Sequence, residues 1–267
     1  MAKLANPIAL VTGASGGLGL AIAERLAKDG FRITLFDIDE DGAHASAAGI
    51  PGAQGYGCDI TNEDEVAKNL QRLVSDFGSC PDVLVNNAGI VRFGDFLEHS
   101  VEDFRRVVDV NLVGTFVMSR EVGKGMAIRG SGTIVNVTSL NAFAPSPDAG
   151  AYPATKAAIA KMTEQMALSL GPRGVRVNAV APGFINAGMS SPIYEDPKIL
   201  AERGSSVPAG RIGTAEDVAD TISFLVSDQA DYIHGQHLLV DGGVFCSLKK
   251  QMPRNAPKAA ENKPCAT

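Results

Sequence analysis

Three side chains stand out for the proton chemistry that their types and spacing allow: Tyr152, Lys156 and Ser139. The tyrosine and the lysine are four residues apart in a segment, 151–170, that is expected to be helical, so they share one face, one turn apart. A free tyrosine has a pKa of about 10, and a nearby ammonium lowers that pKa by favouring the phenolate. Ser139 follows an apolar strand expected over 133–137, where its hydroxyl could orient a substrate oxygen. Together the three predict a tyrosine acid/base. Taken alone, the Tyr152–Lys156 pair would ordinarily be a solvated helix face, and Ser139 would ordinarily be a cap at a strand end.

A glycine-rich turn near the N-terminus is typical of dinucleotide binding. Gly13, Gly17 and Gly19 lie between an apolar run over 8–11 and a helical pattern over 20–28. The first glycine permits a tight turn, the second lets the backbone approach a pyrophosphate, and the third lets helix and strand pack closely. The N-terminus of the helix favours the anion through its unpaired N–H groups and its dipole. Glycines also mark ordinary turns, but here the strand and the helix that the motif demands are both present.

Asp37 ends a second predicted strand, over 32–36, about 20 residues after the glycine turn. A carboxylate at this spacing accepts hydrogen bonds from the adenosine ribose and repels a 2′-phosphate. No Arg or Lys occurs over 13–19, and Ile38 follows the acid. The pattern therefore favours NAD over NADP, with a turn-capping role for Asp37 as the alternative.

Apolar runs and helical patterns alternate along the chain. Strands are expected at 8–11, 32–36, 82–85, 133–137, 175–180 and 237–240. Helices are expected at 20–28, 63–77, 101–127, 151–170 and 215–227, the second of them capped by Asn62. Such alternation predicts an α/β fold with a parallel sheet covered by helices on both faces. The ligand crevice then lies at the carboxyl ends of the strands, where Gly13, Asn86, Ser139 and Pro182 occur.

Two segments lack this alternation. Residues 186–213 are rich in Gly and Pro with little periodicity, which is typical of an irregular lid over a binding site. Residues 246–267 carry mostly basic charges and several prolines. We therefore expect one domain over 1–245, with a substrate loop at about 186–213, followed by a flexible C-terminal tail over 246–267.

Composition narrows the range of partners and locations. With 267 residues and 45% hydrophobic content, the chain can bury a full core as one domain. A net charge of −6 and a pI of about 5.3 argue against nucleic acid or an anionic membrane as partner. The N-terminal sequence lacks the apolar region of a signal peptide, and four dispersed cysteines without a CxxC pair favour a reducing cytoplasm. His234 and His237 have a ligand-like spacing, but without a third ligand we expect loop residues and no metal.

In combination, these features resemble the short-chain dehydrogenase/reductase family from about residue 5 to residue 244. The matching motifs follow the family's order and spacing: Thr12-Gly-x-x-x-Gly-x-Gly19, Asp59, Asn86-Asn-Ala-Gly89, Asn111, Ser139, Tyr152-x-x-x-Lys156 and Pro182-Gly183. The resemblance implies a single doubly wound Rossmann domain on a seven-stranded parallel sheet. It also implies a homotetramer, whose contacts the helices over 101–127 and 151–170 would supply.

The resemblance also assigns roles to particular residues. It implies that Tyr152 is the acid/base, that Lys156 binds the nicotinamide ribose and tunes the tyrosine, and that Ser139 positions the reacting oxygen. Asn111 would support a water-linked proton relay through the lysine. The expected NAD contacts are Gly13, Ser15, Gly17, Leu18, Gly19, Asp37, Asp59, Ile60, Asn86, Ala88, Gly89, Tyr152, Lys156, Pro182, Gly183 and Ile185.

Three positions depart from the family pattern. Ala187 stands where many members have a threonine that hydrogen-bonds the carboxamide, so one nicotinamide contact is expected to be missing. Pro153 follows the tyrosine, and Thr155 replaces a common serine before the lysine; both are compatible with a first helical turn.

These features predict an enzyme that moves a hydride between NAD and a secondary alcohol or carbonyl. The substrate expected is a small polyhydroxylated compound (an aldose, a polyol or a sugar acid) that contacts Arg92, Asn141, Ser139 and Tyr152. The polar loop side chains are equally well explained as residues satisfied within the loop. A 3-oxoacyl thioester reductase, usually NADPH-dependent, is the alternative enzyme. A non-catalytic NAD-binding sensor is the second alternative, and it would be expected to have lost Ser139, Tyr152 or Lys156.

Overall fold

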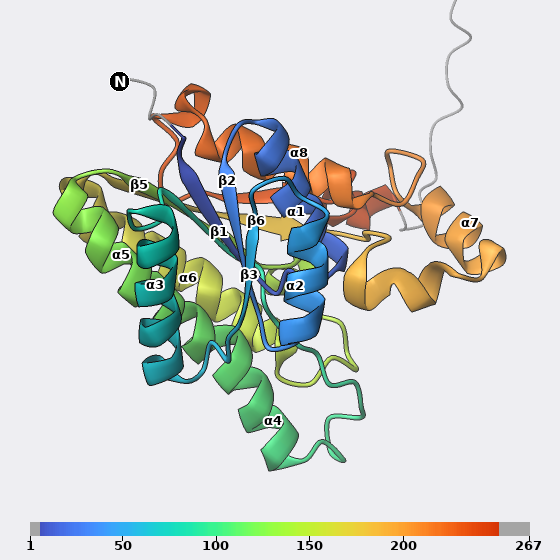
Figure 1. The fold of residues 1–267 in the computed structure, drawn as a ribbon. Helices are drawn as coiled ribbons and strands as arrows, with labels where there is room; N and C mark the ends of the chain where they lie inside the picture. The colour runs from blue at the N-terminus through green and yellow to red at the C-terminus, as the bar shows by residue number, and fades with distance from the viewer. Residues whose placement is uncertain (1–5, 251–267) are drawn as a thin grey trace, which may run out of the picture.

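Seven parallel strands form one sheet at the centre of the molecule (Figure 1). In the computed structural model, which describes residues 6–250, the strand order is β3-β2-β1-β4-β5-β6-β7. The strands are β1 Ile8–Thr12, β2 Arg32–Asp37, β3 Gln54–Gly57, β4 Val83–Asn86, β5 Gly132–Val137, β6 Val175–Pro182 and β7 His237–Val240. The predicted doubly wound parallel sheet is confirmed, and its order reverses between β1 and β4, where such folds bind dinucleotides.

Helices cover both faces of the sheet. They are α1 Gly17–Lys28, α2 Glu40–Ala48, α3 Glu63–Phe77, α4 Val101–Val108, α5 Thr115–Arg129, α6 Tyr152–Leu170, α7 Pro197–Ser206 and α8 Ala215–Val226. α1 and α8 lie side by side on one face, whereas α3, α5 and α6 pack on the other (Figure 1). The long loops at the carboxyl ends of the strands are thereby held by a rigid three-layer body.

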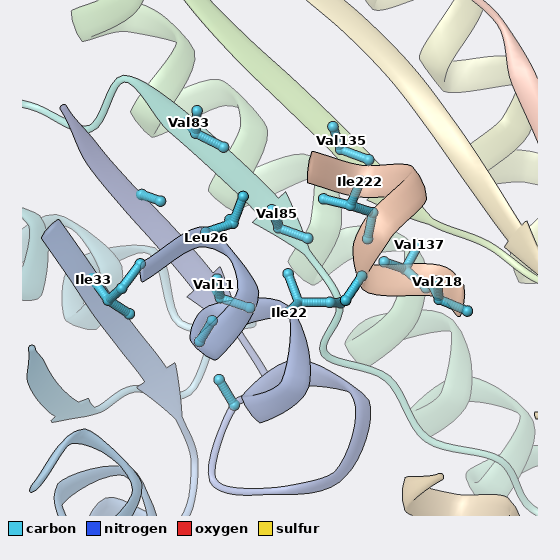
Figure 2. Packing of buried hydrophobic residues seen from close by; sticks show 14 of the residues in the cluster. Val11, Ile22, Leu26, Ile33, Val83, Val85, Val135, Val137, Val218 and Ile222 are labelled. Carbon is cyan, nitrogen blue, oxygen red and sulfur yellow. The ribbon is translucent and has the colours of Figure 1, made fainter. Parts of the chain in front are cut away.

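Alternating side chains along each strand divide the core into two apolar layers. In β1, Ala9 and Val11 face α1 and α8, while Ile8 and Leu10 face the opposite layer of helices. Figure 2 shows the first layer, where valine and isoleucine side chains of neighbouring strands meet α1 and α8. Because both faces are buried, most strands are continuous apolar runs in the sequence.

The sequence-based expectation lacks one strand, the helices α2 and α7, and one helical irregularity. The four residues of β3, Gln-Gly-Tyr-Gly, contain no apolar run, and pairing with β2 makes them a strand. The single helix expected over 101–127 is wrong in detail, because a π-helical turn, Asp109–Gly114, separates α4 from α5. Such turns are rare and are common at functional sites.

The segment over 186–213 is more regular than its composition indicates. It contains a 3-10 helix, Gly188–Tyr194, and the helix α7, and it encloses an apolar cluster of Tyr194, Val207 and Ile212. The expectation of a mostly irregular stretch is therefore wrong. Asp196 accepts a hydrogen bond from the backbone N–H of Lys198 and so caps α7, which a proline begins.

The predicted C-terminal tail lies only partly within the described residues. Its first residues belong to a 3-10 helix, Phe245–Lys250. Residues 251–267, which the sequence predicts to be flexible, lie outside the described part of the chain. Among residues 6–250, none of the helices combines the length and the apolar character that a membrane crossing needs.

Candidate active site

Ser139, Tyr152, Lys156 and Asn111 converge beyond the carboxyl end of β5. Ser139 follows this strand, and its hydroxyl interacts with the phenol of Tyr152 in the first turn of α6, whose pKa it lowers. One turn later, Lys156 Nζ lies 5.4 Å from the centroid of the Tyr152 ring. Asn111, in the π-helical turn, donates from Nδ2 to Thr155 Oγ1 over 3.2 Å. The structure therefore brings together the four residues that the sequence singles out for catalysis.

Lys156 is a buried cation. Its side chain donates from Nζ to the backbone carbonyl of Val137 over 2.9 Å, and the residue is only 3% exposed. Burial lowers the pKa of this ammonium from 10.5 to about 8, because the protein solvates the charged form less well than water does. The lysine is thus fixed at the end of β5 with its charge directed toward the tyrosine.

The pKa of Tyr152 differs from the sequence-based expectation. Desolvation of the phenol raises its pKa above the ordinary value of 10, while the hydrogen bond with Ser139 lowers it. The expected net lowering is therefore wrong for these protein groups by themselves, because desolvation disfavours the phenolate more than Ser139 favours it.

Asn111 holds the turn that follows β4. Its Oδ1 accepts from the backbone N–H of Ile90 over 2.8 Å, and its Nδ2 donates to the Ile90 carbonyl over 2.9 Å. The hydroxyl of Thr115 donates to the Asn111 carbonyl over 2.6 Å. A side chain at Gly89 would stand 3.2 Å from Asn111 Oδ1 and 3.5 Å from Lys156 Nζ, so both groups face this glycine. Asn111 and Lys156, the two residues that the expected proton relay would use, thus lie close to the same glycine. The relay itself stays a prediction.

The loop after Ser139 is ordered by its own polar groups. Ser139 Oγ accepts from the backbone N–H of Asn141 over 3.1 Å, and Asn141 Oδ1 accepts from the backbone N–H of Ser146 over 2.7 Å. Arg92, the other predicted substrate contact, has its side chain 52% exposed and its Nε 3.6 Å from an Asp103 carboxylate oxygen. Asn141 is therefore beside the Ser139 hydroxyl, whereas the Arg92 side chain is paired with an acid of α4.

The glycine turn has the geometry that its sequence predicts. Gly13 and Gly17 have positive φ values of 64° and 55°, a conformation that side chains disfavour. A Cβ at Gly19 would lie 2.2 Å from the carbonyl oxygen of Gly13, so this glycine allows α1 to pack against the turn. α1 has no acidic residue in its first turn and no side-chain cap at Gly16. Its N-terminal N–H groups are therefore suited to an anion such as a pyrophosphate.

Asp37 closes the same turn from the end of β2. Its Oδ2 accepts from the backbone N–H of Ser15 over 2.9 Å, and its Oδ1 accepts from the backbone N–H of Asp39 over 3.0 Å. The carboxylate is therefore fixed beside the glycine turn, where an adenosine ribose would lie. Glycine turn, helix N-terminus and acid together fit an adenine dinucleotide.

Some predicted NAD contacts also have roles within the protein. Asp59 Oδ1 accepts from the backbone and hydroxyl of Thr61, and Ile60 is buried against the π-helical turn at Gly114. The side chain of Asn86 points into the core and donates to Ser119 Oγ and Asn136 Oδ1, each over 2.8 Å, so its expected contact with NAD falls to the backbone and stays a prediction.

Asn87 is a site residue to which the sequence analysis assigned no role of its own. Its Nδ2 donates to the carbonyls of Thr12 and Gly13 over 3.0 and 2.8 Å. The hydroxyl of Thr12 in turn accepts from the backbone N–H groups of Asn87 and Ala88, each over 3.1 Å. These bonds join the turn after β4 to the glycine turn, a link between segments distant in sequence that spacing alone does not reveal.

The remaining predicted contacts follow β6. Pro182 ends this strand, and a Cβ at Gly183 would lie 2.6 Å from Asp241, so only glycine fits there. Ile185 is buried, and Ala187 precedes the 3-10 helix as its cap without a side-chain hydrogen bond. Leu18 faces this segment, since a Cβ at Gly188 would be 3.7 Å from the Leu18 backbone nitrogen.

A separate cavity of about 560 Å³ lies behind this segment. Ile185 lines it together with Arg211, Asp217 and the end of β7. None of the four converging residues contributes to its wall. Within the part of the chain that the structure describes, no group of three or more His, Cys, Asp or Glu side chains could hold a metal ion.

Comparisons with known proteins agree with this geometry. A family model described as enoyl-(acyl carrier protein) reductase matches residues 13–245. A 2-(S)-hydroxypropyl-CoM dehydrogenase from Xanthobacter autotrophicus is 38% identical over 250 residues, which cover 91% of this chain and 98% of that protein. A protein provisionally assigned as an NAD(P)-dependent gluconate 5-dehydrogenase from Beutenbergia cavernae, solved with NADP at low occupancy, is 36% identical, with a TM-score of 0.83 over 92% of this chain and 99% of its own. A 3-ketoacyl-(acyl-carrier-protein) reductase from Brucella melitensis, complexed with NADH, is 33% identical, with a TM-score of 0.83 over 91% and 99%.

Proposed function

The chain belongs to the short-chain dehydrogenase/reductase family, and from that premise we propose that it is an NAD-dependent dehydrogenase of a small polyhydroxylated alcohol. The observation that carries the proposal is the Ser139–Tyr152–Lys156 cluster at the end of β5. The same edge of the sheet holds the glycine turn and Asp37. The substrate class proposed is an aldose, a polyol or a sugar acid.

In the proposed reaction, each residue of the cluster has one task. Ser139 Oγ holds the substrate oxygen, and Tyr152 removes its proton during oxidation or returns it during reduction. Lys156, kept in place by the Val137 carbonyl, supplies positive charge beside the phenol and binds the ribose of the nicotinamide half. Bound NAD supplies the hydride acceptor and a cationic ring. Asn111 keeps the turn at Ile90 in place and so fixes the backbone that lies next to Lys156.

The proposed cofactor preference depends on one charge. Two backbone N–H groups hold the Asp37 carboxylate beside the glycine turn, and a cofactor whose ribose lay there would have its 2′-phosphate repelled. The similar proteins were solved with NADP in one case and NADH in another, so family membership alone leaves the choice open.

The Asp37→Asn variant tests this preference. The amide keeps the shape and one acceptor oxygen but removes the negative charge, so we expect kcat/KM with NADP to rise relative to NAD. Steady-state kinetics with both cofactors measure the ratio, and Asp41→Asn, an exposed acid of the neighbouring helix α2, is the matched control. Wild-type protein that uses NADP as well as NAD would contradict the proposal.

The substrate class rests on polar groups near Ser139 and on the similarity to a gluconate dehydrogenase. A site that hydrogen-bonds hydroxyls rejects analogues that lack them, because its own polar groups are left unpaired. A panel of sugars, polyols and sugar acids with their deoxy analogues, assayed by NADH absorbance, tests it.

A second candidate is a 3-oxoacyl thioester reductase, which the similarity to the NADH-bound reductase favours. If acyl thioesters with NADH give a higher kcat/KM than every sugar and polyol, this candidate replaces the first. Absence of turnover on the whole panel, with NAD binding retained, would instead support the non-catalytic sensor.

We also propose that the enzyme works as a cytoplasmic homotetramer. The dispersed cysteines support the location, and exposed apolar side chains on α4 and α5 support the assembly.

A further inference from the structure

His237 lies behind the catalytic serine. It begins β7, and its Nε2 is hydrogen-bonded to Thr138 Oγ1 across the intervening strand β6. Its ring stacks on that of Phe143, with centroids 4.4 Å apart and planes inclined by 26°. Thr138 immediately precedes Ser139, and Phe143 ends the short helix that follows it. One imidazole therefore holds both ends of the segment that carries the serine.

The hydrogen bonds around Thr138 determine which atom donates. The Thr138 hydroxyl donates to the carbonyl of Val180 over 3.0 Å, and this buried hydroxyl has only one proton to give. We therefore assign the hydrogen of the neutral ring to His237 Nε2, which donates to Thr138 Oγ1. Burial lowers the pKa of His237 to about 4, against the opposing effect of Glu164 on α6. The donor is thus a neutral imidazole at neutral pH.

The held segment determines where the serine hydroxyl lies. Ser139 Oγ accepts from the backbone N–H of Asn141 within the segment, and outside the segment the same hydroxyl acts on the phenol of Tyr152, whose pKa it lowers. A displacement of Thr138 or Phe143 would therefore move Oγ relative to the phenol. Catalysis is sensitive to such shifts, since a misplacement of about 1 Å can cost about 100-fold in rate.

We propose that His237 is a positioning residue that sets the alignment of Ser139 with Tyr152, through the hydrogen bond to Thr138 and the stack on Phe143. The inference rests on the proposed roles of Ser139 and Tyr152, but it holds for any substrate whose oxygen these two residues share.

Two substitutions separate the two contacts. His237→Phe keeps an aromatic ring for Phe143 and loses the donor to Thr138, whereas His237→Gln keeps a donor and loses the ring. We expect kcat to fall by about 10-fold in the first and less in the second, with the Kd for NADH changed by no more than about twofold. Thr138→Val should add little to His237→Phe, because both remove the same hydrogen bond.

The pH profile provides a readout that a general loss of stability would not change. In alcohol oxidation the rate rises as Tyr152 loses its proton, and the Ser139 hydrogen bond lowers the pKa of that phenol. Lys156, the charged group that faces the phenol, is unaltered in these variants. Misplacing the serine should therefore move the acid limb of the kcat profile to higher pH, by about half a unit or more.

His234→Gln is the matched control. This histidine lies three residues earlier and contacts only backbone, with Nδ1 accepting from Val177 N and Nε2 bonded to the Ala167 carbonyl. We expect the control to lower the melting temperature at least as much as the His237 variants while leaving kcat and its pH profile unchanged. Equal profiles in the control and the His237 variants would overturn the inference.

Amide hydrogen exchange tests the same inference without turnover. The backbone amides over 138–144 should exchange faster in both His237 variants and at the wild-type rate in His234→Gln. Unchanged exchange over 138–144 in His237→Phe would overturn the positioning role even if the proposed substrate were correct. Conversely, if only acyl thioesters react in the substrate panel, the proposed substrate class is wrong and the role of His237 is unaffected.

Discussion

Burial works against the ionised forms of both Tyr152 and Lys156. Desolvation raises the pKa of the phenol and lowers the pKa of the ammonium, so each residue is held where its charged form is disfavoured. A group tuned in this way is ready to exchange a proton when a ligand changes its surroundings. Proton-transfer groups at active sites are commonly arranged like this, often at a cost in stability.

Removing the phenolic oxygen should stop the chemistry and leave the fold intact. In Tyr152→Phe, we expect turnover to fall by about 10²–10⁴-fold, the usual contribution of a proton-transfer group, while NADH binding persists. Steady-state kinetics and fluorescence titration with NADH measure the two effects. Tyr232→Phe, at a fully exposed tyrosine, is the control and should behave like the wild type. Turnover within a few-fold of the wild type in Tyr152→Phe would reject the acid/base role.

Lys156 should give stability a particular dependence on pH. Its folded pKa of about 8 is below the ordinary 10.5, so between these values the unfolded chain binds more protons than the folded protein. The free energy of unfolding that the lysine contributes therefore rises from about pH 8 to about pH 10.5, and below pH 8 the full cost of the buried ammonium is present.

The Lys156→Met variant lacks this titration. We expect its free energy of unfolding, relative to that of the wild type, to decrease steadily across the same pH range, as measured by urea denaturation at fixed ionic strength. Lys161→Met, at an exposed lysine of the same helix, should show no such trend. A pH-independent difference for the Lys156 variant would mean that the ammonium is not destabilised by burial.

Among the elements, the segment after β6 is notable for a missing polar side chain at Ala187. Ala187 precedes the 3-10 helix Gly188–Tyr194 in an extended conformation and offers no side-chain cap. A threonine there could cap the helix through its oxygen and still have a proton for a ligand carbonyl. The family resemblance places the nicotinamide carboxamide near this position.

Ala187→Thr should therefore tighten cofactor binding. We expect NADH affinity to improve by about 0.5–1.5 kcal/mol, the net contribution of one hydrogen bond, with little change in turnover. Isothermal titration with NADH measures the change, and Ala187→Val, which adds similar bulk without the hydroxyl, is the control. Equal effects in the two variants would mean that another group already holds the carboxamide.

The elements that the sequence predicts are those whose pattern is local. The buried strands are apolar runs, and α3 is recognisable from its Asn62 cap and its helical period. β3 and the π-helical turn escape prediction because a neighbouring strand and the packing around Asn111 determine them. The same distinction separates the parts of the site. The motif residues are readable from spacing, whereas the roles of Asn87 and His237 depend on contacts between distant segments.

At the scale of the whole molecule, several apolar side chains are exposed on α4, the π-helical turn and α5. Phe104, Val113 and Phe116 are each exposed by between 39% and 47% on this continuous helical unit. Exposed apolar groups of this kind mark association surfaces. They agree with the proposed tetramer, in which helices at these positions supply contacts.

The assembly prediction is direct to test. Light scattering at micromolar protein should give a mass about four times the chain mass of 27.8 kDa. Phe116→Glu places a charge on the apolar surface and should shift the mass downward, while Glu102→Gln, a substitution at an exposed polar residue of α4, should not. A monomer in the wild type would contradict the prediction.

The support of the site depends on the one extra residue that the π-helical turn contains. Its hydrogen bonds span one residue more than those of an α-helix, so α4 and α5 together hold one residue that a regular helix would not need. Deleting a residue of this turn other than Asn111 would let the helix run regularly, and the helical hydrogen bonding of the backbone would be kept. The deletion would remove the wide turn that presents the Asn111 side chain, and so separate Asn111 from Thr155 or from Ile90. A single deletion would thus disrupt the support of the site, although it alters the type of no remaining side chain. A comparison of residue types alone would not detect the damage.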